Sequence, residues 1–243
     1  MKINSILKAW LGGLLILVGV LIGLAFSGSA MWSELEARLY TFYTGDRSFG
    51  IHCPLMLAPG ETGTVQATIA NLTNDNITPQ VSIEISHLPL SRKSNQTVSL
   101  PANASQSLEW TVTSDDVVYQ RLILVSVWQL RYRDNPSRLG SCGILWFNLF
   151  GLSGTESADL ILTVSLLAMF LGAWMWLNAR HPLDEISKNL ARIGATLISI
   201  TLFALLSALL RWWGLTLFFD ALILLVVGVI VSDFSIFSQK QKG

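Results

Sequence analysis

The sequence lacks the motifs that identify most enzymes and nucleic-acid-binding proteins. It contains no Gly-rich phosphate loop, no GxSxG or HExxH motif and no paired carboxylates in a convincing site. Its basic clusters, Arg92-Lys93 and Arg131 to Arg133, are too small for a nucleic-acid footprint. We therefore predict neither an enzyme nor a partner nucleic acid, and no bound cofactor.

Charged residues are scarce as well, and their scarcity points to a membrane. Lys, Arg, Asp and Glu make up 13% of the 243 residues, whereas hydrophobic residues make up 51%. Four apolar stretches, at residues 6–26, 160–177, 193–210 and 215–231, are each long enough or nearly long enough to cross a bilayer. A charge-free stretch such as 160–177 gives about 27 Å of helix, close to the hydrocarbon thickness. The sequence therefore predicts an integral membrane protein with four transmembrane helices and the lipid bilayer as its surroundings.

The few basic residues near the predicted spans are unevenly distributed, and this orients the chain. Those at the N-terminus, between the second and third spans and in the C-terminal tail would lie on one side of the membrane. The opposite short loop, Arg211 to Gly214, holds a single Arg. The positive-inside rule then places both termini in the cytoplasm and residues 31–156 outside it, in a multi-pass protein of the plasma (inner) membrane. The basic residues on the cytoplasmic side are Lys2, Lys8, Arg180, Lys188, Arg192, Lys240 and Lys242.

These patterns divide the chain into segments. Residues 1–30 form the first span, which is either an uncleaved anchor or a signal peptide, since the small residues Gly28 and Ala30 follow the apolar run. In the next segment, residues 31–47, Trp32, Leu35, Leu39 and Phe42 recur at helical spacing, which predicts an amphipathic helix on the membrane surface or against the outer domain. The remaining predicted segments are the outer domain at 48–156, the second span at 157–179, an amphipathic cytoplasmic loop at 180–192, a hairpin of the last two spans at 193–232 and a tail at 233–243.

Within the outer segment the hydrophobic period changes to two. Apolar and polar residues alternate over 64–69, 81–86 and 108–112, whereas 118–130 and 142–149 are longer apolar runs. Turn signals such as Pro59-Gly60, Asn74-Asp75-Asn76, Ser94-Asn95 and Asp115-Asp116 separate the runs. Six or seven short strands at this spacing predict an antiparallel β-sandwich.

Three short motifs in this segment resemble those of bacterial Ig-like surface modules. They are the turn Pro59-Gly60-Glu61, the strand end Ile69-Ala70-Asn71 and the later strand Leu108-Glu109-Trp110-Thr111-Val112. The resemblance implies an Ig-like fold, in modules that bind, space or decorate and generally catalyse no reaction. The predicted fold class is therefore an α+β membrane protein, with four transmembrane helices and an inserted extracytoplasmic antiparallel Ig-like β-sandwich.

Cys53 and Cys142 are the only cysteines, and both fall in the outer segment. Outside the cytoplasm such a pair predicts a structural disulfide, because a redox pair is usually closely spaced. Free thiols or a metal site with His52 remain the alternative. No two histidines have the spacing of metal ligands, so we predict no metal.

Asp220 is the one ionisable residue well inside a predicted span. Arg211, on the other arm of the same hairpin, is its candidate partner in an intramembrane ion pair. An acid at this position has either that structural role or a role in transport, proton movement or subunit contact.

Two further patterns concern packing and modification. Gly19 and Gly23 form a GxxxG motif, which predicts close helix packing. Asn71, Asn76, Asn95 and Asn103 each begin an N-x-S/T sequon, which carries a glycan in a eukaryotic secretory protein but arises by composition in a bacterial domain rich in Asn, Ser and Thr.

Taken as a whole, the sequence predicts an accessory, scaffold or assembly subunit that contacts other membrane-protein subunits, or further copies of itself, through its outer domain and helices. The alternative is a component of a transporter or channel with Asp220 near the path. A third hypothesis, a membrane-bound redox or metal enzyme, requires that Cys53 and Cys142 be unbonded.

Overall fold

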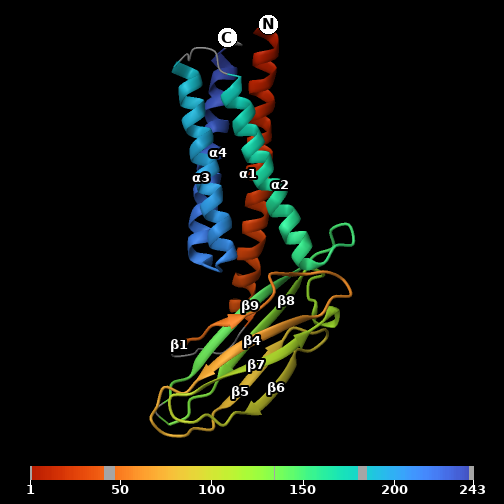
Figure 1. Cartoon of the computed structure of the whole chain (residues 1–243), viewed down its shortest axis with the longest axis vertical. Coiled ribbons are helices and arrows are strands. Elements are labelled where there is room, and N and C mark those ends of the chain that lie inside the picture. Colours follow the sequence, from red (N-terminus) through yellow and green to blue (C-terminus); the bar gives the residue numbers. More distant parts are fainter. Residues whose placement is uncertain (1, 41–46, 134, 180–184, 241–243) are drawn as a thin grey trace. The chain divides into compact units, whose positions relative to one another are not determined.

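The structure is a computed structural model that describes residues 2–40, 47–133, 135–179 and 185–240. The chain divides into two compact units, each described here by itself (Figure 1). The helix unit consists of Met1–Met31 and Asp159–Gly243, and the β unit consists of Trp32–Ala158. Part of the predicted loop at 180–192 lies outside the described residues. Arg180 and Lys242 also lie outside them.

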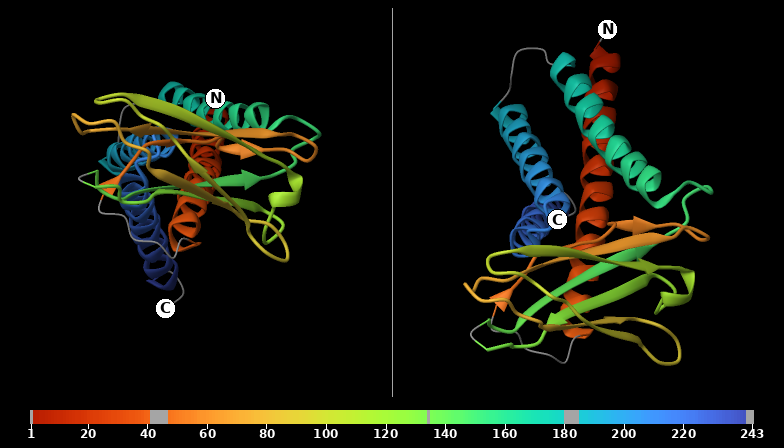
Figure 2. Two further views of the ribbon diagram at one scale, coloured as in Figure 1. Left: turned by 90° about the horizontal axis from the view of Figure 1, so that it is seen from below. Right: turned by 60° about the horizontal axis from the view of Figure 1, so that its bottom comes forward.

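The helix unit is built from four helices. They are α1 (Lys2–Tyr40), α2 (Gly154–Asn178), α3 (Glu185–Leu209) and α4 (Trp213–Lys240). The last turns of α1 and the first turn of α2 belong to the β unit. Helices α3 and α4 lie antiparallel beside each other, joined by a turn of three residues (Figures 1 and 2).

Three helices of the described part of the chain are long and apolar enough to cross a membrane. Their spans are Leu7–Tyr40, Gly154–Asn178 and Arg192–Leu209. In α4 the apolar described stretch is shorter, Trp213–Val229. The structure therefore supports a membrane protein with three candidate spans, and the fourth predicted span belongs to the proposal below.

The β unit contains two sheets. Its strands are β1 (Arg47–Ser48), β2 (Ile51–His52), β3 (Met56–Leu57), β4 (Gly63–Ala70), β5 (Gln80–Ile85), β6 (Arg92–Thr97), β7 (Ser105–Val112), β8 (Leu122–Gln129) and β9 (Arg138–Trp146), with a short 3₁₀ helix η1 (Ser114–Asp116) before β8. One sheet has the order β1-β9-β8-β5-β6, with β3 also paired to β9, and the other has the order β2-β4-β7. The long strands pair antiparallel, but β1 and β3 each pair parallel with β9, so the larger sheet is mixed rather than purely antiparallel.

Strand β6 corrects a sequence-based prediction. Ser94-Asn95 was predicted to be a turn, but both residues lie inside β6, paired with β5. The strand was missed because β6 is an edge strand whose residues are all exposed or only half-buried, so it shows no apolar alternation.

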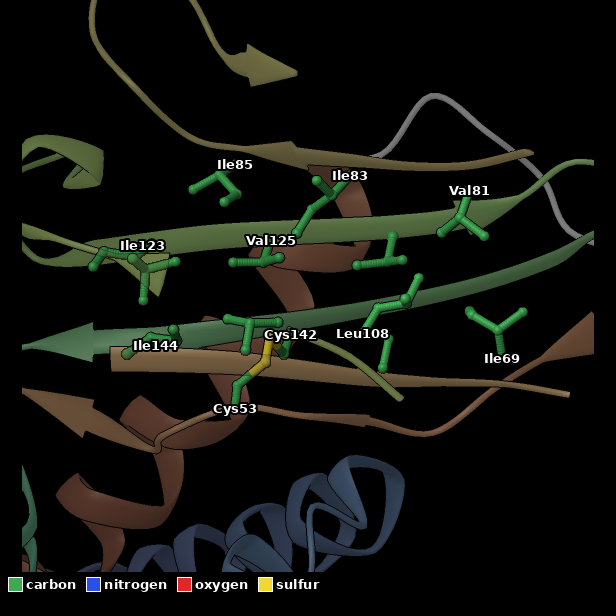
Figure 3. Close-up of a cluster of buried hydrophobic side chains, with 14 of the residues drawn as sticks. Cys53, Ile69, Val81, Ile83, Ile85, Leu108, Ile123, Val125, Cys142 and Ile144 are labelled. Carbon is green, nitrogen blue, oxygen red and sulfur yellow. A yellow bond between two sulfur atoms is a disulfide. The ribbon is translucent and has the colours of Figure 1, made fainter. Parts of the chain in front are cut away.

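One apolar core lies between the two sheets of the β unit (Figure 3). Strand β4 contributes Val65, Ala67 and Ile69 from the smaller sheet, and alternate residues of β5 and β8 contribute from the larger sheet. Every residue of β8 is buried, as expected for a strand that lies between β9 and β5. Cys53 and Cys142 lie within this core and are joined by a disulfide.

The last turns of α1 belong to the β unit and cover the outer face of the larger sheet. Ala37 is fully buried against Leu122 and Leu124 of β8. Gly143 of β9 lies directly below Ser33, and a Cβ atom on Gly143 would collide with the Ser33 backbone. This contact is so close because small residues meet on both surfaces.

Small residues of this segment, rather than the predicted stripe of large ones, pack against the sheet, and a stripe that contacts the membrane surface stays a prediction. Trp32 and Leu39 are exposed, whereas Ser33 and Ala37 are buried. Helical spacing alone selected the large residues, but the close approach of helix and sheet accommodates only small ones. Phe42 lies outside the described residues.

Candidate functional site

A buried carboxylate in the helix unit is the candidate site. Asp220 lies two turns into α4 and is 5% exposed. Its Oδ1 accepts a hydrogen bond of 2.7 Å from the hydroxyl of Ser27 in α1. Its Oδ2 is buried, lies near Gly28 and has no hydrogen-bond partner among the residues that the structure describes. One oxygen of this carboxyl group is therefore satisfied and the other is available.

Ser27 can hold the carboxyl group in either protonation state. Its hydroxyl lies 3.0 Å from the Gly23 carbonyl oxygen as well as 2.7 Å from Asp220. Ionised Asp220 accepts from Ser27, whereas protonated Asp220 can donate to it while Ser27 donates to Gly23. The geometry at Ser27 is therefore compatible with a carboxylate or a carboxylic acid at position 220.

Arg211 lies in the turn between α3 and α4, two residues after α3 ends at Leu209. Its φ of 56° is left-handed, its N–H donates to Ala208, and the N–H of Trp212 donates to Ser207. These bonds form a Schellman motif, which usually has glycine at this position. Ser27 is the partner that the structure gives Asp220, and the ion pair between Arg211 and Asp220 stays a prediction.

Other buried hydroxyl groups of the helix unit donate hydrogen bonds either to a neighbouring helix or to their own helix. Ser165 donates to the Gly19 carbonyl, linking α2 to α1, and Thr201 donates to its own helix. Thr216, one turn before Asp220, donates to Ser207 across the α3–α4 hairpin at 3.1 Å. The bonds of Ser165 and Thr216 therefore join helices, and in the part of the helix unit that is described none of these bonds forms a chain that reaches Asp220.

The predicted packing glycines contact other helices of the same chain. A Cβ atom on Gly19 would lie 2.8 Å from the Ser165 carbonyl oxygen and 2.7 Å from Met169. A Cβ atom on Gly23 would lie 2.8 Å from Thr201 in α3. The GxxxG face of α1 is thus occupied by α2 and α3, and a partner protein would have to use another surface.

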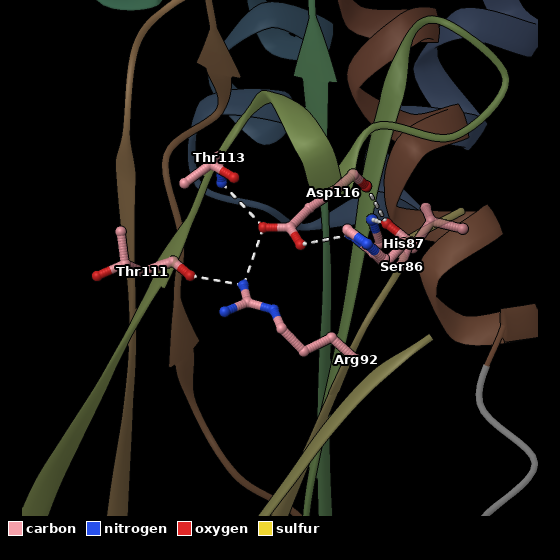
Figure 4. A network of polar contacts seen from close by, with 7 residues as sticks. Ser86, His87, Arg92, Thr111, Thr113 and Asp116 are labelled. Atoms are coloured by element: carbon pink, nitrogen blue, oxygen red, sulfur yellow. Dashed lines mark hydrogen bonds and ion pairs between the residues drawn. The ribbon is translucent and has the colours of Figure 1, made fainter. Parts of the chain in front are cut away.

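A second polar cluster lies in the β unit around Asp116 (Figure 4). This carboxylate is 1% exposed and accepts hydrogen bonds of 2.9 Å from Arg92 and from the Thr113 backbone N–H. The Asp116 carbonyl oxygen accepts from the hydroxyl of Ser86, and His87 Nδ1 lies 3.6 Å from the carboxylate. The cluster therefore joins the ends of β5 and β6 to the segment that contains η1.

Sequence reasoning treated Asp116 only as part of a turn. The available signal was the Thr-x-x-Asp spacing of a helix start, in which the acid bonds back to a backbone N–H. Its pairing with Arg92 depends on where β6 lies, and β6 itself was not predicted.

The described residues contain no cluster of side chains that could bind a metal ion. No group of three or more His, Cys, Asp and Glu side chains there could hold a metal ion. His52 is exposed on β2.

The first of the four sequons is not accessible to a glycan. Asn71 is buried, and its amide donates to the carbonyl groups of Asp75 and Pro101, so a glycan there would break the local structure. The other sequon residues, Asn76, Asn95 and Asn103, are exposed.

Comparisons with known proteins give a loose likeness of fold. No protein-family model and no curated protein sequence matches the chain. The CARDB domain of a Pyrococcus furiosus protein, solved with di-metal ions, is 14% identical over 44% of this chain and 99% of its own, with a TM-score of 0.32. A Paenibacillus sp. cycloisomaltooligosaccharide glucanotransferase is 19% identical over 44% of this chain and 15% of its own, with a TM-score of 0.34. A Pseudomonas fluorescens alkylpurine DNA glycosylase is 16% identical over 42% of this chain and 31% of its own, with a TM-score of 0.32.

The matches overturn the prediction that the chain is not an enzyme. Two of these three proteins are enzymes, and this chain spans less than a third of the length of either. The prediction was based on the absence of known catalytic motifs. Neither a fold nor a list of motifs is sufficient to determine function. At these TM-scores the likeness assigns no activity either, and it supports the Ig-like resemblance only as a loose one.

Proposed function

We propose that this chain is a membrane-embedded accessory, scaffold or assembly subunit. Its four helices cross the membrane, both termini lie in the cytoplasm, and the β unit forms an extracytoplasmic Ig-like sandwich that engages partner subunits. The observation that carries the proposal is the contrast between a disulfide-tied β unit and a helix unit whose large apolar residues face outward.

The disulfide supports the side of the membrane assigned to the β unit. Disulfides persist in oxidising compartments and are rare in the cytosol. Cys53 and Cys142 are bonded within the apolar core, 89 residues apart in sequence. This agrees with the excess of basic residues on the predicted cytoplasmic side, which places the same segment outside.

The outward residues of the helix unit support its place in lipid and leave surface for partners. Large side chains such as Phe170, Phe203, Phe218 and Leu225 are each more than half exposed. Lipid solvates such residues, and the interior holds glycine and hydroxyl residues at helix contacts together with aliphatic residues such as Val20 and Ile223. Partners are then contacted by this outer helix surface or by the β unit, because the GxxxG face is already covered.

Copurification tests the subunit role. The full chain with a C-terminal affinity tag, extracted in mild detergent, is expected to bring down one or a few membrane proteins, or further copies of itself, in fixed ratio. The Cys53→Ser, Cys142→Ser double variant serves as a comparison, since it weakens the β unit and leaves the helix unit unchanged. Recovery of the full chain alone as a monomer would contradict the proposal.

One observation favours the alternative, a component of a transporter or channel. The unpartnered Oδ2 of Asp220 is a buried acceptor at a depth where polar groups are costly. If it binds a proton or substrate group, Asp220→Asn abolishes transport by the assembled complex, whereas Asp159→Asn, at an exposed position of α2, leaves it unchanged. Equal transport by both variants would remove this alternative.

A further inference from the structure

The β unit carries a set of exposed apolar side chains at one end. They lie on three connecting segments: 86–91 between β5 and β6, 113–121 between β7 and β8, and 147–153 between β9 and α2. Their exposed fractions are 67% for Leu88, 78% for Leu90, 66% for Tyr119, 46% for Phe147 and 90% for Phe150. Single exposed residues of this kind are common on protein surfaces, but several at one end of a domain mark an interaction site for a partner or a membrane.

Direct hydrogen bonds place the three segments side by side. The Ser86 hydroxyl donates to the Asp116 carbonyl oxygen at 2.6 Å, which joins the first segment to the second. The Trp146 N–H donates to the Arg121 carbonyl oxygen at 2.8 Å, which joins the second to the start of the third. The Asp116 cluster of Figure 4 thus holds the first two segments together, and the bond from Trp146 joins the third to them.

The same end of the β unit is where α2 begins. Ser153 and Glu156 form a capping box, in which Ser153 donates to Glu156 and the Glu156 N–H donates back at 3.3 Å. The Gly154 N–H donates to the Glu61 carboxylate at 2.8 Å, and a Cβ atom on Gly154 would collide with the Met56 backbone. The start of α2 is therefore fixed to the β unit.

The length of helix before the apolar run sets the height of this end above the bilayer. The apolar run of α2 begins at Leu160, six residues after Gly154, which corresponds to about 9 Å of helix. The headgroup region on each side of a bilayer is roughly 5 to 8 Å thick. With α2 as a membrane span, a β unit joined to it at Gly154 can keep the end that carries the apolar set no farther from the hydrocarbon than about the outer edge of the headgroup layer.

We propose that these three segments insert into the outer leaflet, with Leu88, Leu90, Tyr119, Phe147 and Phe150 in contact with lipid. The β unit then rests on the membrane rather than moving freely above it. Aromatic and aliphatic residues are the ones that favour this interface, and the rigid support of the segments keeps the entropic cost of insertion small. This inference rests on the proposed membrane span of α2.

Fluorescence quenching in liposomes tests the inference on the full chain. Single cysteines are introduced by Leu90→Cys, Phe150→Cys and, as a control, Leu72→Cys, which is 57% exposed at the opposite end of the β unit. Each is labelled with the fluorophore NBD without reductant, so that the Cys53–Cys142 disulfide stays closed. Labels at 90 and 150 are expected to be quenched by shallow doxyl-labelled phosphatidylcholine at least threefold more than the label at 72.

A label in α2 separates failure of the inference from failure of the proposed topology. Phe170→Cys lies in the middle of α2 at a 69% exposed position and is expected to be quenched by deep doxyl lipid. If position 170 is quenched but position 90 or 150 behaves as position 72 does, the inference is wrong and the proposed topology stands. Aqueous iodide access to 90 and 150 in that case leaves these residues as a surface for a protein partner. If the label at position 170 is not quenched, both the proposed membrane topology and the inference about the three segments are wrong.

Discussion

The two units of the chain differ in where their large apolar side chains lie. In the β unit large aliphatic residues such as Ile83 and Ile123 are fully buried between the sheets, and the exposed large hydrophobic residues of its described part lie outside the strands. In the helix unit small residues such as Gly12 and Ser27 are buried together with aliphatic residues such as Ile223, whereas many Leu and Phe residues face outward. The β unit is thus organised for water and the helix unit for lipid, where apolar burial contributes little to association.

The buried carboxylates of the two units differ in the number of partners around them. In the β unit the buried carboxylate of Asp116 has an arginine, a backbone N–H and a histidine around it. In the helix unit the buried carboxylate of Asp220 has one serine. Different forces therefore hold the two units together, and substitutions should affect them differently.

Removing the disulfide should have the largest effect, and only on the β unit. The Cys53→Ser, Cys142→Ser variant is expected to lose about 4 kcal/mol of β-unit stability, because the bridge closes a long loop in the unfolded chain. Hydrogen exchange measured by mass spectrometry should show faster exchange in β8 and β9. Exchange in α3 and α4 should not change, and equal acceleration in both units would contradict the division into two units.

Truncating one large apolar side chain in each unit compares water with lipid directly. Ile83→Ala leaves a cavity in the β core and is expected to cost about 3 kcal/mol. Phe170→Ala, on the outer face of α2, should cost well under about 1 kcal/mol in a bilayer, since lipid fills the space. Hydrogen exchange of β5 and α2 in nanodiscs measures both, and a large loss for Phe170→Ala would show that protein covers this residue.

Adding a methyl group at two adjacent glycines tests packing inside the helix unit. A Cβ atom on Gly12 would lie 2.7 Å from the Gly172 carbonyl oxygen, whereas a Cβ atom on Gly13 would meet nothing within 4 Å. Gly12→Ala should therefore destabilise by about 2 kcal/mol through overpacking. Gly13→Ala should stabilise by up to about 1 kcal/mol through helix propensity. Thermal unfolding in detergent, followed by tryptophan fluorescence, should give shifts of opposite sign.

The smallest effect is expected from the hydrogen bond to Asp220. Ser27→Ala removes the donor and should cost about 0.6 kcal/mol, the average for such bonds between membrane helices. Ser29→Ala is the matched control, because Ser29 is exposed and bonds only the Ala25 carbonyl oxygen of its own helix. The same thermal assay should separate the two, and identical curves would show that the Ser27 bond contributes nothing.

Part of this arrangement could be predicted from the sequence. Strands β4 and β7 were predicted because each has one face on the core and alternates accordingly. Strand β5 was predicted from its alternating sequence, although both of its faces are buried, and β8 was predicted from its mostly apolar run. The spans were predicted from apolar runs that exceed the length of ordinary core helices. The alternation of the strands and the apolar runs of the spans are both patterns among residues that are close in the sequence.

The parts that were missed depend on residues distant in sequence. Strands β1 and β3 are two residues each and exist because β9 lies beside them. Ser27 and Asp220 are 193 residues apart, and nothing local to either residue indicates the other. The apolar set at one end of the β unit also required the strand registers, since its members come from three separate connecting segments.

The sequence by itself determined which solvent each part of the chain requires and that its two cysteines would pair. Both depend on composition and period over short distances. The tertiary structure decided which small residues meet, which carboxylate is covered and which connecting segments share one end of the β unit. These contacts arise only when separate elements approach, because sterics and hydrogen bonding act over a few ångströms in space regardless of the distance along the chain.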